Sequence, residues 1–172
     1  MKEEKHLQAV PVEGFRLPRY AELPTVGLYL EQITRYVNDY LAKAGCAGLT
    51  ASMVSNYVKQ KTVPPPVKKA YGADAIACLL YVAFVKRVMP MEDVRLLWRA
   101  LCAQRPLPET YDGFCAALEA ALRAAFGLRA EPEPDGAACT AAVRVLHTAV
   151  RTAAQQLYLD SCLCRLRGEQ PR

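Results

Sequence analysis

Residues 50–76 read TASMVSNYVKQKTVPPPVKKAYGADAI, and this stretch decides the fold. Its first ten residues place apolar side chains on one helical face and small polar or basic side chains on the opposite face. Three prolines at 64–66 then forbid a helix and force extended or turn geometry. After Gly72 the chain restarts as a helix that is apolar nearly all round, which is typical of an element at the centre of a core.

The basic charge is concentrated in the same stretch. The chain has 172 residues, 52% of them hydrophobic, and a net charge of +5, so it is long enough for one globular domain or a small domain with a helical extension. Four lysines and no acidic residue lie between Thr50 and Lys69, whereas three acidic residues gather at 131–135. Because the total charge is mild, its position along the chain is what suggests an acidic partner.

Neither a membrane nor an oxidising compartment is expected. The N-terminal residues are charged and lack the apolar stretch of a signal peptide, and the longest apolar run, near 75–85, is too short to span a bilayer. Seven cysteines fit neither a disulfide framework nor metal-ligand spacing, so they are expected to be reduced and packed in helices. We therefore predict a cytoplasmic protein with no cofactor, no metal and no membrane partner.

Apolar periodicity predicts helices almost everywhere after an extended, proline-containing arm at 15–24. Glycines and prolines mark where these helices end or begin, and Thr50 is a good N-cap. The expected helices run from Thr25 to Gly45, from Thr50 to about Gln60, from Gly72 to Val88, from Pro90 to about Leu101, from about Pro108 to Phe126, and onward from Asp135. The residues predicted to share one core are Val54, Tyr57, Ile76, Leu80, Leu97 and Trp98.

The last helix carries an apolar stripe in steps of four and three, which is the pattern of a helix packed along another helix. Two arrangements fit this stripe. It forms the seam of a homodimer, or it packs back on residues 111–126 of the same chain. The stripe consists of Cys139, Val143, Leu146, Val150, Ala153 and Leu157.

The outward face of the helix after Thr50 suggests contact with nucleic acid. It presents hydroxyls, an amide and a cation, which can bond to base edges and phosphates. Lys68 and Lys69 follow the prolines, in a segment that can form a short hairpin arm of the kind called a wing in winged helix-turn-helix proteins. The alternative from spacing alone is that this face is merely solvated and the lysines merely aid solubility.

Two strings carry a family resemblance: LPRYAELP, and LTASMVSNYVKQKTVPPPVKKAYGADAIACLLYVAFVKRVMPMEDV. Over residues 15–105 they resemble a bacterial family, the domain of unknown function 1836. More distantly, the same core is similar to MerR-type winged helix-turn-helix regulators. This second resemblance implies that Tyr57 and Lys59 lie near the end of a recognition helix, that Pro64 and Pro65 form its exit, and that Lys68, Lys69 and Tyr71 lie on the wing.

The chain departs from the MerR pattern at two positions that bear on function. Ser55 stands where an arginine is usual. Lys61 stands where a glycine usually ends the helix, which implies a left-handed residue with a side chain, or a different turn.

These observations predict an all-α protein with a small wing and a C-terminal helical hairpin. Its expected parts are a flexible N-terminus (1–14), a MerR-like winged helix-turn-helix domain (15–105) and a helical extension that could dimerise (106–172). The expected function is transcriptional regulation by binding double-stranded DNA; the alternative is a helical protein-interaction module. No catalytic set appears at recognisable spacing, so no enzymatic activity is expected. The predicted DNA-binding residues are Thr50, Ser52, Ser55, Asn56, Tyr57, Lys59, Lys61, Lys68, Lys69 and Tyr71.

Overall fold

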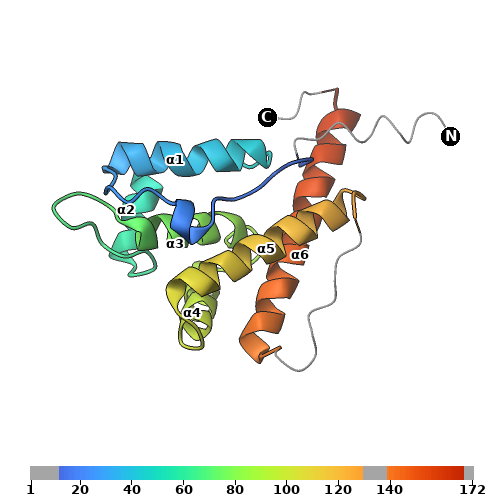
Figure 1. Ribbon diagram of the computed structural model, residues 1–172. Helices are drawn as coiled ribbons and strands as arrows, with labels where there is room; N and C mark the ends of the chain where they lie inside the picture. Colours follow the sequence, from blue (N-terminus) through green and yellow to red (C-terminus); the bar gives the residue numbers. More distant parts are fainter. Residues whose placement is uncertain (1–11, 130–138, 169–172) are drawn as a thin grey trace.

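The computed structural model describes residues 12–129 and 139–168 of the chain. These residues form a short 3-10 helix (Tyr20–Glu22) and six α-helices, whose arrangement is shown in Figure 1. The α-helices are α1 (Leu30–Lys43), α2 (Ala51–Lys59), α3 (Ala73–Val85), α4 (Met91–Cys102), α5 (Leu107–Ala125) and α6 (Ala141–Leu166). The predicted all-α class is confirmed, since no strand forms within the described ranges.

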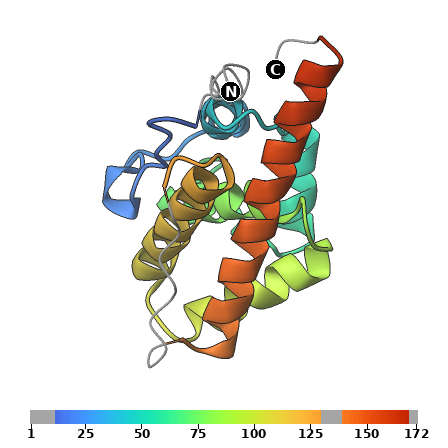
Figure 2. The same ribbon diagram turned by 90° about the vertical axis from the view of Figure 1, so that its right-hand side faces the viewer.

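The most apolar helix, α3, lies at the centre of the molecule. Every residue from Ala75 to Val85 is buried, because α1, α5 and α6 all pack against this helix. Figure 2 shows α6 crossing in front of α3. No helix in the described ranges is long and apolar enough to cross a membrane. The prediction of a shared core is confirmed for all six of its residues: Val54, Tyr57, Ile76, Leu80, Leu97 and Trp98.

Helix α1 begins at Leu30, five residues after the predicted start at Thr25. The backbone of Leu28 is held in an antiparallel bridge with Tyr71, through reciprocal N–H to O bonds of 2.9 and 2.8 Å. A residue bonded to a distant segment in this way cannot also begin a helix. The periodic stripe itself is as predicted, with Ile33, Val37 and Leu41 buried.

The turn between α1 and α2 is fixed by one side-chain amide. Asn38 Nδ2 donates to the carbonyl oxygen of Leu49 (2.9 Å), and Asn38 Oδ1 accepts from the Leu49 N–H (2.7 Å). Gly45, with φ of +70°, ends α1 as predicted. The predicted N-cap is also present, since Thr50 Oγ1 accepts a 3.2 Å bond from the N–H of Met53. Together these contacts set the angle at which α2 leaves α1.

Helices α5 and α6 run in the same direction, so the predicted helical hairpin is wrong. Near the start of both helices, Thr140 Oγ1 donates to Gln104 Oε1 at 2.7 Å. Near the end of α5, the ring of Phe126 meets that of Tyr158 at 5.2 Å. The colour gradient in Figure 1 follows the same parallel course. A hairpin was expected because the apolar stripe of the last helix could pack back on residues 111–126.

The apolar stripe of α6 packs against this chain's own α5, the second of the two arrangements expected from the sequence. Cys139 precedes the N-cap Thr140 and so lies outside the helix, while the predicted start at Asp135 lies outside the described residues. Val143 is half-buried, and the buried members of the stripe are Leu146, Val150, Ala153 and Leu157. A homodimer through these four side chains would require the core to open.

The arm before α1 is clamped onto α5 by a largely buried ion pair. The Arg19 guanidinium donates two bonds, of 2.7 and 2.8 Å, to the carboxylate of Glu119, which also accepts from the Leu17 N–H at 2.9 Å. Two turns earlier on α5, Asp112 Oδ1 accepts from the N–H of Tyr20 at 2.7 Å. The pKa of Arg19 is raised, chiefly by its bond to Glu119. Residues on both sides of the predicted boundary at 105/106 therefore share one core and one polar clamp.

All seven cysteines are free thiols. Burial raises the pKa of Cys78 and of Cys115 to about 12, and that of Cys46 to about 11. Such thiols stay protonated and pack as small apolar groups.

Candidate nucleic-acid interface

Helix α2 presents a polar face to solvent. Its apolar side faces the core, with Val54 buried, while Ser52, Asn56 and Lys59 are exposed. These three residues are four and three positions apart, so they share one face. Ser55 is half-buried beside this face, and Thr50 is exposed but uses its hydroxyl to cap α2; the remaining predicted residue on α2 is Tyr57.

Lys61 ends α2 in the left-handed conformation, the first of the two possibilities that its position in the sequence implied. Its φ is +56°, and the N–H groups of Lys61 and Thr62 donate to the carbonyls of Val58 and Tyr57, both at 2.9 Å. This pair of bonds is the Schellman arrangement, in which glycine is the usual left-handed residue. The lysine side chain is exposed there.

Lys68 and Lys69 form the two-residue turn of a small hairpin. Val67 and Ala70 are bridged by reciprocal backbone bonds of 2.9 Å, and both lysines between them have positive φ, of 49° and 67°. Positive φ at both central residues is the pattern of a type I′ turn. The loop projects at the far left in Figure 1, at the opposite end of the molecule from α6. The hairpin is anchored at its base by the bridge between Leu28 and Tyr71.

The non-glycine residues with positive φ in the described ranges are all lysines of this surface: Lys61, Lys68 and Lys69. A side chain in the left-handed region costs about 1–2 kcal/mol relative to the right-handed helix, and glycine or asparagine avoids much of this cost. Strain of this kind persists where something other than stability favours the residue.

Two predicted contact residues are corrected, because their side chains lie in the core. Tyr57 is 7% exposed and Tyr71 5% exposed. The hydroxyl of Tyr57 accepts a 3.0 Å bond from Lys86 Nζ, whose ammonium also lies 5.6 Å from the centre of the tyrosine ring. These tyrosines support α2 and the hairpin from beneath, so they are not part of the exposed surface.

Two arginines of α4 were missed by sequence reasoning. Arg95 and Arg99 line a groove together with Lys59 and Lys61 from the end of α2. We call this hollow of about 480 Å³ the α2–α4 groove; its walls include Pro64 and Trp98. The four-residue spacing of the two arginines on one helix was the available signal, but nothing local indicated which element that face would meet.

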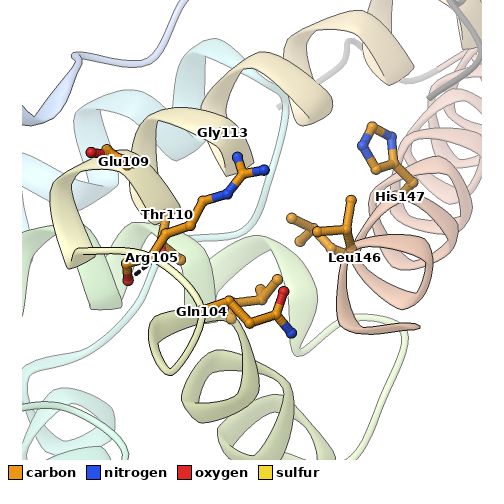
Figure 3. Close-up of a pocket in the computed structure, with 9 residues that line it drawn as sticks. Gln104, Arg105, Glu109, Thr110, Gly113, Leu146 and His147 are labelled. Carbon is orange, nitrogen blue, oxygen red and sulfur yellow. Dashed lines mark hydrogen bonds between the residues drawn. The ribbon is translucent and has the colours of Figure 1, made fainter. Parts of the chain in front are cut away.

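A second hollow, of about 110 Å³, lies between the α4–α5 turn and α6 (Figure 3). Arg105 and Glu109 line it from the α5 side and His147 from α6; the Nδ1 atom of His147 is buried without a hydrogen-bond partner among the described residues. The hollow is small beside the roughly 300–1,000 Å³ of most ligand sites and has room for a few waters. No three potential metal ligands gather within 12–129 and 139–168.

The arrangement is that of an all-helical protein in which lysines at the end of α2 and arginines of α4 line one groove. The chain matches the family described as domain of unknown function 1836 over residues 18–114, more than half its length, and it belongs to that family. The match begins within the clamped arm and ends inside α5, so it includes α2, the hairpin and the α2–α4 groove. No curated protein and no solved structure matches the chain.

Proposed function

We propose that this protein is a DNA-binding transcriptional regulator of winged helix-turn-helix, MerR-like design. In this proposal α2 enters the major groove, and the hairpin turn at Lys68 and Lys69 acts as the wing on the phosphate backbone. The support comes from the exposed polar face of α2, the absence of acidic residues on it, and the position of α2 after the turn that Asn38 fixes.

One observation carries the proposal: the three left-handed non-glycine residues of the described chain are all exposed lysines on this surface. If these positions served the fold alone, glycine or asparagine would be the better residue at each of them. Lysine at these positions lowers the stability of the fold, and binding to a strongly anionic partner would explain why it is retained. The phosphate backbone of a duplex is such a partner.

The direct test is binding to a labelled duplex of random sequence at several salt concentrations. Replacing Lys68 and Lys69 together by alanine should weaken binding to every sequence and reduce the salt slope by about 0.9 for each phosphate that the variant no longer neutralises. A slope equal to that of the unmodified protein would remove the hairpin from the interface.

Sequence reading is tested at Asn56, whose amide can pair with adenine in the major groove. After selection of bound duplexes from a random pool, Asn56→Ala should cost about 1–3 kcal/mol on the selected site and much less on random duplex. Equal losses on both duplexes would exclude a base contact by this residue.

A protein-interaction module is the second candidate, and an exposed apolar stripe on α6 favours it. This stripe lies on the face of α6 that does not pack on α5. Leu159, Leu163 and Leu166 are four and three positions apart near the end of α6, and they are 56%, 37% and 84% exposed. Contiguous exposed apolar residues often mark contact sites for other proteins. Failure to bind any duplex, with retention of a protein partner whose binding Leu159→Glu abolishes, would favour this candidate.

A further inference from the structure

The α2–α4 groove is built differently from the rest of the cationic surface. Lys59 and Lys61 reach it from the end of α2, while Arg95 and Arg99 come from α4, about 35 residues later in the chain. No acidic side chain lines it; the acidic residues of α4, Glu92 and Asp93, lie in its first turn. Four cations from two elements thus converge on one hollow.

One of these cations is held in place by the fold. Arg95 Nη1 donates a 3.0 Å bond to the carbonyl oxygen of Gln60, the C-cap residue of α2. A guanidinium has five N–H donors, so this bond leaves others for a second acceptor. The same bond holds the Arg95 side of the groove in a fixed position relative to the end of α2. An anion bound here would therefore have a fixed position relative to the polar face of that helix.

The shape of the groove also limits its occupant. Pro64 and Trp98 form rigid walls, and Trp98 is 8% exposed, so its ring is part of the core rather than a platform for stacking a base. Apart from Thr62, which is 7% exposed, the polar side chains that line the groove carry ammonium or guanidinium groups. Such a set binds phosphate or carboxylate oxygens, and guanidinium groups suit phosphate in particular.

We propose that the α2–α4 groove binds a backbone phosphate of double-stranded DNA next to the point where α2 enters the duplex. In this site Arg99 is the main cation that contacts the phosphate. This inference rests on the proposed function and extends the interface from α2 and the hairpin to α4. It also explains why Lys61 is a lysine: the left-handed position at the end of α2 carries a cation that lines the groove.

The experiment compares Arg99→Gln with Arg144→Gln in the full-length protein, using duplex binding as a function of salt. Arg144 is an exposed arginine on α6, so its change removes the same charge away from the groove. We expect Arg99→Gln to reduce the salt slope by about 0.9 and the affinity several-fold, and Arg144→Gln to leave the slope unchanged. Arg99→Lys should keep most of the slope, and equal melting temperatures would establish that all three variants are folded.

The outcomes separate this inference from the proposed function. If Arg99→Gln matches Arg144→Gln while the double change at Lys68 and Lys69 lowers the slope, the groove is not a phosphate site but DNA binding stands. If the unmodified protein binds no duplex, both fail. Stabilisation of the unmodified protein by inorganic phosphate without duplex binding, or tighter binding to RNA of the same length, would overturn the assignment to duplex DNA.

Discussion

At the scale of single residues, three positions combine strain with charge. Lys61, Lys68 and Lys69 occupy backbone conformations that favour glycine, and all three are exposed. For Lys61 the sequence left two possibilities, a left-handed residue or a different turn, because this lysine stands where a glycine usually ends the helix in the MerR pattern. The sequence did not predict a left-handed residue at the other two, because a two-residue turn is recognised by glycine or asparagine, and here both places are lysine.

Lys61 allows stability and binding to be separated. Lys61→Gly relieves the left-handed strain, which stabilises the folded state, but it also raises the conformational entropy of the unfolded chain, which opposes that gain. We expect a net increase of about 0.5–1 kcal/mol in the free energy of unfolding. The same change removes a cation, so duplex affinity should fall together with the salt slope. Lys61→Ala is the control, because it removes the charge but keeps the strained side chain; urea denaturation and duplex titration measure both effects. Parallel losses of stability and affinity in the glycine variant would contradict this account.

At the scale of elements, the sequence predicted what local patterns determine. The N-cap at Thr50 and the glycine that ends α1 are present, because caps depend on a few neighbouring residues. The start of α1 was wrong because Leu28 pairs with Tyr71, a contact that no local pattern encodes. Similarly, Arg95 and Arg99 belong to the groove only because α4 meets the end of α2.

The central position of α3 predicts a large cost for truncating one of its side chains. Leu80 is fully buried. Leu80→Ala should lower the free energy of unfolding by about 2–5 kcal/mol, because apolar packing is removed and a cavity is left behind. Leu96→Ala is the matched control, because Leu96 is 66% exposed on α4 and its loss should stay within about 0.5 kcal/mol. Chemical denaturation compares the two, and similar losses would mean that α3 is not the centre of the core.

At the scale of the whole molecule, both the arm before α1 and the last helix pack against the central helices. The arm before α1 is bonded to α5, and α6 packs on α3, α4 and α5. The sequence suggested an arm leading into one domain and a separate helical extension, because neither arm nor extension has a local signal for its partner. The buried Glu119 in an apolar helical run was the one hint, since such a carboxylate needs a cationic partner. The parallel course of α5 and α6 had no sequence signal.

The clamp between Arg19 and Glu119 predicts how strongly the arm and α5 depend on each other. Arg19→Ala leaves the buried Glu119 carboxylate without its cation and with only the Leu17 N–H as a partner, so we expect the free energy of unfolding to fall by about 3 kcal/mol. The chain supplies its own control in Arg16, which forms an exposed pair with Glu22 at 2.8 Å. Because solvent screens an exposed ion pair, Arg16→Ala should cost much less than Arg19→Ala. Urea denaturation of the two variants measures both costs.

A second change, at Glu119, separates the clamp from general loss of structure. Arg19→Ala combined with Glu119→Gln should recover much of the loss, because the amide is uncharged and its oxygen can still accept from the Leu17 N–H. Urea denaturation compares this double variant with Arg19→Ala. If the double variant is no more stable than Arg19→Ala, the ion pair does not couple the arm to α5.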